Sequence, residues 1–308
     1  MSVRIGYMPS TFGSCAEGVA LFRKLVSVGD QYGYDSIWMS DRMVSSEHIP
    51  DPLISLAMVA AYSERLKFGT SVLQLPLRNP VVLAKEIATL DFLSGGRFLP
   101  AVGLGQEDPK EYETFGIRKE ERAERTDEAL ILMRRLWHEE SVTYHGKFYS
   151  VSQASINPKP IQEPFLPIWV GGRSKAAQRR VGRLGDGWLA SSVLPKEVED
   201  GIKVIFSTAE QCSRYIESDH IGVIVGFRIT KDKRTATELA KSHILRQRSQ
   251  AHFTEYSALG TPSQVISVIQ SYIRAGASKF VMRPLCSADQ AIGQLEMLGK
   301  EVVPYFHR

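Results

Sequence analysis

The stretch LKFGTSVLQLPLRNPVVLAKEIATLDFLSGGRFLPAVGLG (66–105) contains the pattern that decides the fold. Its first part, 66–76, is rich in apolar and β-branched residues and predicts a strand. Residues 80–94 predict a helix, and RFLPAVGLG (97–105) predicts a second strand. A strand, a helix and a strand in this order form a βαβ unit, whose two strands are parallel.

The same alternation continues in both directions along the chain. Expected strands lie at 3–9, 36–40, 66–76, 97–105, 168–172, 187–192, 220–230 and 279–285. Expected helices lie at 19–29, 52–64, 80–94, 174–185, 195–217, 236–250, 262–275 and 288–303, and a further helix ends at 137. Thr261 as N-cap and Pro262 as first residue would open the helix at 262–275.

Eight strands, each followed by a helix, favour a single (β/α)8 TIM barrel. Residues 139–166 would form an insertion, with a β-hairpin at 142–151, and residues 1–308 one domain. A doubly wound open sheet uses the same alternation. It usually has fewer strands and a glycine-rich first turn, whereas the first turn here, MPSTFGS (8–14), lacks GxGxxG.

Composition excludes several classes of protein. The chain has 308 residues, with 38 Lys and Arg against 34 Asp and Glu, so its formal net charge is only +4. This excess is too weak for a dedicated nucleic-acid binder. Cys15, Cys212 and Cys286 lie far apart, which argues against a disulfide framework and for a reducing compartment. With no apolar run of ~18 residues and no signal-peptide core, we expect a soluble cytoplasmic protein.

The ends of the expected strands are where a barrel would carry its active site. Asp41 and Arg42 end the second strand, although Asp is also a common turn residue. Gly103, Leu104 and Gly105 end the fourth, where small residues let a ligand approach the backbone. Gln106 and Glu107 follow and could supply hydrogen bonds or a proton, although a surface loop would look the same at Glu107.

Two further strand ends suggest anion binding. Gly171 and Gly172 precede a helix whose N-terminus could bind phosphate, close to the basic residues Arg173, Lys175 and Arg179. A basic solvated helix face would have the same sequence. Arg283 leaves the last apolar strand, so its charge must face the barrel mouth, where it could bind an anion or pair with a carboxylate. The seven histidines show no metal-ligand spacing, and no GxSxG motif is present, so we predict neither a metal site nor a serine hydrolase.

Several motifs together resemble the bacterial-luciferase-like flavin and deazaflavin oxidoreductases, a superfamily of TIM barrels. They span nearly the whole chain in family order. The matching stretches are SIWMSDR (36–42), GTSVL with RNP (69–80), RFLPAVGLG with EYETFG (97–116), MRRLW (133–137), YHGKFY with PKPIQ and PIWVGG (144–172), LGDGWLA (184–190) and GTPSQV with YIRAGASKFVMRPL (260–285).

The resemblance implies an isoalloxazine-type cofactor across the barrel mouth. In the branch that uses coenzyme F420, an Asp at the end of the second strand contacts the deazaflavin, and Asp41 matches it. A non-proline cis peptide at the end of the third strand lies under the ring, and Ser71–Val72 matches it. We assign Gly105 to the same cofactor site.

The phosphate of that cofactor would bind at the opposite end of the site. Gly171 and Gly172 match its glycine pair, and Ser191 or Ser192 matches its serine. Arg283 lies where relatives of this branch can have a phosphate-binding Arg. The cofactor's acidic tail would suit the basic residues around Arg173.

The chain also departs from the pattern of deazaflavin-dependent sugar-phosphate dehydrogenases. Those enzymes follow the Asp with a His and a nearby Trp, whereas Arg42 and Ser46 stand here. Their acid at the fourth strand is replaced by Gln106. The chain is therefore not expected to be such a dehydrogenase. FMN-dependent monooxygenases of the superfamily are usually longer and carry other polar residues at these positions, which favours the deazaflavin.

Three hypotheses follow. The first is an oxidoreductase that transfers hydride between F420 and an unidentified organic substrate, with Gln106 or Glu107 contacting substrate or relaying a proton. The second is an FMN-dependent monooxygenase that activates O2 with FMNH2, and a partner flavin or deazaflavin reductase would supply the reduced cofactor. The third is a protein that binds a flavin without turnover, or a barrel recruited as a structural partner. The resemblance also implies a homodimer, and the loops at 43–51, 106–120 and 139–166 would select the substrate.

Overall fold

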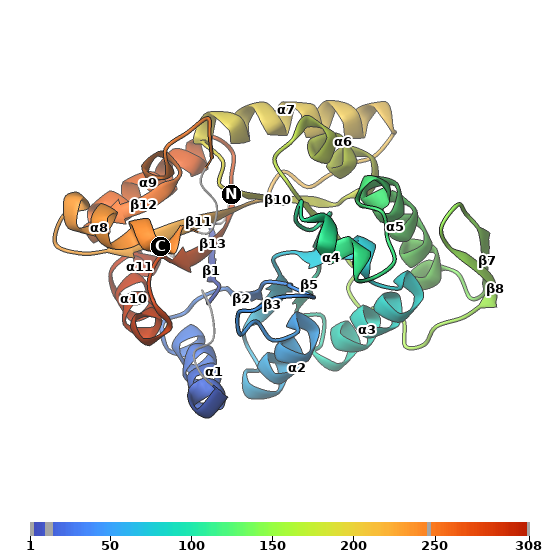
Figure 1. The fold of residues 1–308 in the computed structure, drawn as a ribbon, viewed down its shortest axis with the longest axis horizontal. Coiled ribbons are helices and arrows are strands. Elements are labelled where there is room, and N and C mark those ends of the chain that lie inside the picture. The colour runs from blue at the N-terminus through green and yellow to red at the C-terminus, as the bar shows by residue number, and fades with distance from the viewer. Residues whose placement is uncertain (1–2, 10–14, 245–247, 307–308) are drawn as a thin grey trace.

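A curled parallel sheet inside a ring of helices forms the main body of the protein (Figure 1). The computed structural model describes residues 3–9, 15–244 and 248–306. The first turn at 10–14, part of the expected helix at 236–250 and the side chain of Cys15 lie outside the described residues. Cys212 and Cys286 are free thiols. No helix in the described ranges combines the length and apolar character needed to cross a membrane.

The parallel strands occur where the sequence predicts them, with the exception of β12. Their sheet order is β4-β6-β9-β10-β11-β13-β1-β2-β3-β5, with β12 beside β11. The bounds are β1 (Arg4–Tyr7), β2 (Ser36–Met39), β3 (Lys67–Thr70), β4 (Leu73–Gln74), β5 (Phe98–Leu99), β6 (Ala101–Gly103), β9 (Trp169–Gly171), β10 (Gly187–Ser191), β11 (Ile221–Ile229), β12 (Ser257–Gly260) and β13 (Lys279–Pro284).

The helices alternate with these strands and follow one another around the ring in sequence order, as the colours of Figure 1 show. The α/β class is therefore confirmed, and the curled sheet is consistent with a TIM-barrel-like fold. The bounds are α1 (Cys15–Gln31), α2 (Pro52–Tyr62), α3 (Pro80–Leu93), α4 (Pro109–Glu113), α5 (Arg122–His138), α6 (Lys175–Leu184), α7 (Pro195–Gln211), α8 (Lys233–Ala240), α9 (Pro262–Arg274), α10 (Ala288–Glu301) and α11 (Val303–Phe306).

Two expected helices are shorter than predicted. The helix expected at 236–250 starts at Lys233 and ends at Ala240, and β12, which was not predicted, follows further along. β12 pairs with the distal part of β11, from Gly226 to Ile229. A strand that depends on a partner about 30 residues away has no local periodicity to reveal it. The helix expected to reach 217 ends at Gln211, because Arg214 turns back to form an ion pair with Asp186.

The insertion after α5 is a separate antiparallel hairpin, as predicted. Its strands are β7 (Val142–His145) and β8 (Ser150–Ala154). Figure 1 shows the hairpin at the edge of the molecule, outside α5. It therefore adds a surface element without interrupting the main sheet.

An inner apolar cluster fills the space enclosed by the curled sheet. It contains Met8, Trp38, Ala101, Trp169, Leu189 and Val281. These side chains come from six different strands or strand ends and point inward, because side chains alternate between the two faces of a strand. The carboxyl ends of the strands lie beyond this cluster, so inward-facing residues there surround the mouth.

Candidate active site

The cis peptide between Ser71 and Val72 is present, as the resemblance implied. It lies between β3 and β4, at the carboxyl end of β3. The Val72 side chain packs against two glycines: a Cβ added at Gly103 would lie 2.6 Å from Val72 Cγ2, and one at Gly171 would lie 2.9 Å from Val72 Cγ1. The ends of β6 and β9 therefore present bare backbone around one valine side chain.

Gly105 is close-packed for a similar reason. Its φ is +81°, and an added Cβ would lie 2.9 Å from both Gln74 Nε2 and Tyr112 Oη. Gln74 Oε1 accepts a hydrogen bond from the Met43 backbone N–H at 3.1 Å. Among the described residues, the Nε2 of this buried amide has no hydrogen-bond partner. One donor at this edge of the mouth is therefore free for a ligand.

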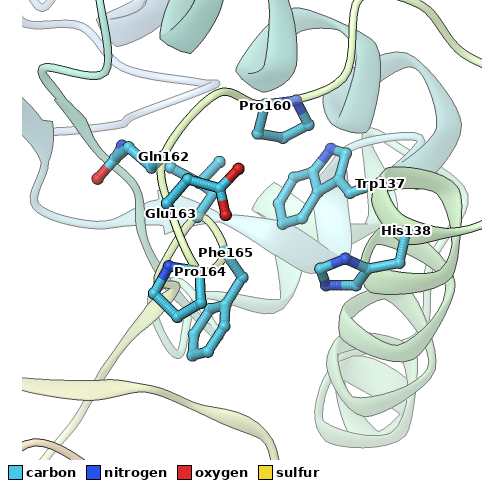
Figure 2. Close-up of a pocket in the computed structure, with 8 residues that line it drawn as sticks. Trp137, His138, Pro160, Gln162, Glu163, Pro164 and Phe165 are labelled. Atoms are coloured by element: carbon cyan, nitrogen blue, oxygen red, sulfur yellow. The ribbon is translucent and has the colours of Figure 1, made fainter.

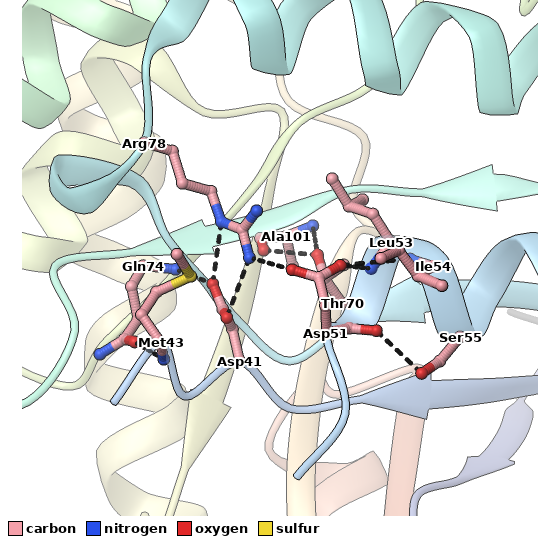
Figure 3. Close-up of polar contacts among 10 residues, drawn as sticks. All are labelled: Asp41, Met43, Asp51, Leu53, Ile54, Ser55, Thr70, Gln74, Arg78 and Ala101. Atoms are coloured by element: carbon pink, nitrogen blue, oxygen red, sulfur yellow. Dashed lines mark hydrogen bonds and ion pairs between the residues drawn. The ribbon is translucent and has the colours of Figure 1, made fainter. Parts of the chain in front are cut away.

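Asp41 is held by the protein on both carboxylate oxygens (Figure 3). Oδ2 accepts from the Gln74 backbone N–H at 2.9 Å and from Arg78 Nε at 3.1 Å. Oδ1 accepts from an Arg78 terminal nitrogen at 3.0 Å, and only 1% of the Asp41 side chain is exposed. Asp41 thus joins the end of β2 to the segment that carries Gln74. Its contact with a cofactor stays a prediction.

Arg78 has a second acidic partner. It donates to Asp51 Oδ2 at 2.9 Å, and Asp51 also caps α2 through the backbone N–H groups of Leu53 and Ile54 (Figure 3). Burial alone would lower the pKa of Arg78, but hydrogen bonds and charge attraction from Asp41 and Asp51 raise it overall. The sequence analysis missed Arg78 because its importance depends on a pairing across 37 residues.

The two predicted catalytic residues lie in different environments. The carbonyl oxygen of Gln106 accepts from Tyr112 Oη at 2.8 Å and from Arg122 at 3.1 Å, so its backbone is fixed near Gly105. The Glu107 side chain is 73% exposed and forms an ion pair with Arg122 at 3.2 Å. Their catalytic roles remain predictions, and the geometry favours Gln106 over the exposed Glu107.

The predicted phosphate site is a turn before α6. Gly172 has a φ of +117° and is exposed, as are Arg173 and Lys175. Ser174 caps α6 by accepting from the Ala177 N–H. Ser191 ends β10 and is exposed, whereas the Ser192 carbonyl is engaged by Arg248 at 2.8 Å. This turn can present N–H groups and positive side chains to an anion.

Arg283 lies away from that turn, on β13. Its terminal nitrogen donates to the carbonyl oxygen of His243 at 3.3 Å. In the sheet, β10 and β11 lie between β13 and β9, the strand that leads to Gly171. The structure also reveals Arg228 on β11, which the sequence analysis missed. The signal that identified Arg283, a charge inside an apolar strand, is present there too in IVGFRIT (224–230).

A pocket of about 140 Å³ lies at the opposite end of the strands, between the end of α5 and the segment that precedes β9 (Figure 2). None of the predicted site residues borders it. Its lining consists of Trp137, His138, Pro160, Gln162, Glu163, Pro164, Phe165 and Leu166. Among the described side chains, no group of three His, Cys, Asp or Glu residues could hold a metal ion.

Comparison with known proteins defines the family. A model of the luciferase-like monooxygenase family matches residues 4–305, so the chain belongs to this family. An F420-dependent glucose-6-phosphate dehydrogenase of Kineococcus radiotolerans is 28% identical over 290 residues, covering 82% of this chain and 83% of that protein. The chain is therefore an enzyme, an oxidoreductase whose relatives use F420 or a flavin.

Solved structures share the fold. The monooxygenase RslO1 from Streptomyces bottropensis superimposes with a TM-score of 0.85 at 20% identity, over 98% of this chain and 99% of that one. The oxygenating constituent of 3,6-diketocamphane monooxygenase of Pseudomonas putida, solved with FMN, gives a TM-score of 0.82 at 18% identity, over 98% of both chains. The fold is thus common to relatives with different cofactors.

Proposed function

We propose that this chain transfers hydride between coenzyme F420 and an organic substrate at the carboxyl ends of its strands. The proposal depends on one observation: the Val72 side chain lies between Gly103 and Gly171, two positions without a side chain, next to the Gly172 turn. We call this surface the floor of the site. A flat ring can rest on the valine where two neighbouring strands carry no side chain. The turn before α6 suits the cofactor's phosphate, so the residues present fit the group.

Each residue then has a distinct task. When bound, the deazaflavin supplies the ring carbon C5 that accepts or donates hydride. Asp41 orients the cofactor site by holding Gln74, and Ser71 and Val72 shape its floor. Gly171, Gly172 and Ser191 bind the phosphate. Gln106 contacts the substrate or relays a proton, with Glu107 as the exposed second candidate.

An FMN-dependent monooxygenase is the alternative, because solved structures of that activity share this fold closely. It would use FMNH2 from a partner reductase together with O2. The same floor and turn would hold FMN, whose phosphate is also an anion. The length of the chain and the polar residues at its strand ends favour the deazaflavin, and a binding measurement tests this preference.

We further propose that residues 1–308 form one (β/α)8 domain and that the enzyme works in the cytoplasm. The pairings of β3 with β5 and of β4 with β6 support the barrel, because they join its third and fourth strands in two steps. Pro100 separates β5 from β6 and cannot donate to a ladder. β3 and β4 together then form the third strand of the barrel, and β5 and β6 together form the fourth.

The test is a titration of the purified chain with F420 and FMN, each oxidised and reduced, followed by tryptophan quenching. We expect F420 to bind and FMN to be ignored. Gly172→Ala should weaken F420 affinity by about tenfold, because its φ of +117° favours glycine and an added Cβ would lie 2.8 Å from Ala177 Cβ, which would distort the turn. Gly293→Ala, in open space on α10, is the control and should leave it unchanged. Preference for FMNH2 would support the monooxygenase, and binding of neither would contradict both.

A further inference from the structure

Two arginines from adjacent strands face the mouth on the side away from the Gly172 turn. Arg283 on β13 lies opposite Gly226 on β11, and Arg228 is two residues beyond Gly226. Residues two apart on a strand share a face. Val281, two residues before Arg283, belongs to the inner apolar cluster. Both guanidinium groups therefore continue the inner face of the sheet toward the mouth.

These guanidinium groups are buried and poorly paired. Only 7% of Arg228 is exposed, and its Nε and one terminal nitrogen have no hydrogen-bond partner among the described residues. The same holds for the buried Nε of Arg283. The oxygen acceptors are Gln290 Oε1 for Arg228 at 2.8 Å and the His243 carbonyl for Arg283 at 3.3 Å, and Arg228 also contacts the Cys286 thiol.

No described carboxylate neutralises this pair. Neither arginine forms an ion pair with an acid in the described ranges, although 21 such contacts occur elsewhere in them. Glu47 acts on Arg283 only through its charge, from an exposed loop. Two buried like charges without a counter-ion are unfavourable unless an anion joins them.

The neighbouring groups do not supply that anion. Burial and the charges of Arg228 and Arg283 lower the pKa of His243, so its imidazole is kept neutral. Burial raises the pKa of the Cys286 thiol, which also stays uncharged although both arginines oppose the effect. His243 and Cys286 are thus uncharged, and the exposed carboxylates of Glu47 and Asp289 act on this region only through their charge. The positive charge of the pair is available to a ligand.

We propose that Arg228 and Arg283 bind an oxyanion of the substrate, a carboxylate or phosphate group. The planar fork of a guanidinium matches two oxygens of such a group, and charge-assisted hydrogen bonds are the strong ones. This inference rests on the proposed function, because the substrate must react at the same mouth. Arg283 then binds the substrate and not the cofactor. The cofactor's phosphate binds separately, at the turn before α6.

Titration calorimetry of the intact chain with inorganic phosphate, and separately with acetate, tests the proposal without cofactor. We expect saturable binding of at least one of these anions, with one equivalent assigned to the arginine pair by its loss in the variants. Arg228→Met and Arg283→Met should each weaken it by about tenfold or more. Arg274→Met, at an exposed position late in α9, is the matched control and should bind as wild type does. Tighter phosphate binding points to a phosphorylated substrate, and tighter acetate binding to a carboxylate.

Absence of binding to both anions, or equal binding by wild type and Arg228→Met, would overturn the proposal. Arg228→Lys is the second variant, for use if the methionine variant does not fold. It keeps the positive charge but loses the planar guanidinium group, so it should bind the anion more weakly than wild type. Arg228→Met should bind F420 with the affinity of the wild type. Weaker F420 binding by this variant would instead put the anion in the cofactor's phosphate site and overturn the assignment. If F420 fails to bind at all, the anion titration still stands, so the two failures are distinguishable.

Discussion

Arg78 connects three segments that are separate in the sequence: the end of β2, the cap of α2 and its own position after β4. Its side chain is 11% exposed and that of Asp41 is 1% exposed, so their ion pair is shielded from solvent. Removing one partner of a buried pair is far more damaging than removing an exposed pair, because the remaining charge is left uncompensated.

Asp41→Asn is accordingly expected to lower the free energy of unfolding by about 3 kcal/mol. Chemical denaturation monitored by circular dichroism measures this. Glu107→Gln, which disrupts an ion pair that is exposed on the Glu107 side, is the control and should change stability little. An unchanged denaturation midpoint for Asp41→Asn would show that the pair does not hold the site together.

At the scale of elements, the hairpin of β7 and β8 is attached to α5 by one buried carboxylate. Glu128 accepts from the backbone N–H groups of Lys147 at 3.1 Å, Phe148 at 3.1 Å and Tyr149 at 2.8 Å. Gly146 lies so close to Glu128 that no side chain fits there. The tip of the hairpin thus depends on this single acceptor.

Glu128→Gln should lower stability by about 2 kcal/mol, because its amide nitrogen cannot accept the hydrogen bonds that one carboxylate oxygen accepts from these partly buried N–H groups. Hydrogen exchange should accelerate at 142–154 and stay unchanged in the main sheet. Glu124→Gln removes only a solvent-exposed pair with Lys147 and serves as the control. Uniform acceleration over the whole chain would contradict a local anchoring role.

At the scale of the whole molecule, α2 and α3 lie side by side on the outside of the ring (Figure 1). Both helices expose large apolar side chains. Ile54 is 70% exposed, Val82 54% and Leu93 74%. Exposed apolar patches of this kind mark association surfaces. We propose that a second copy of this chain covers them.

Light scattering after size exclusion should therefore give twice the chain mass of 34.4 kDa. Introducing charges with Ile54→Glu and Val82→Glu should produce monomers, since a buried unpaired carboxylate opposes association. Val19→Glu, an equally exposed apolar position on α1, should leave the dimer intact. A monomeric wild type would remove the homodimer from the proposal.

Much of the secondary structure could be predicted from the sequence alone. The strands are buried on both faces and read as short apolar runs, while capping residues such as Thr261 mark helix starts locally. β12 and the early end of α8 could not be predicted, because β12 is a strand only where β11 offers it an unpaired edge. The cis peptide at Ser71–Val72 came from the family resemblance and not from local pattern.

The sequence by itself determined the α/β class, the order of the elements and the candidate strand ends, because these follow from local periodicity and from motifs. Only the tertiary structure decided what the charged residues there do. Asp41 meets Arg78, while Arg228 and Arg283 meet no acid among the described residues, since side-chain pairing depends on distances between strands that are remote in sequence. Electrostatic energy varies with those distances and with burial, and neither is encoded in residue order.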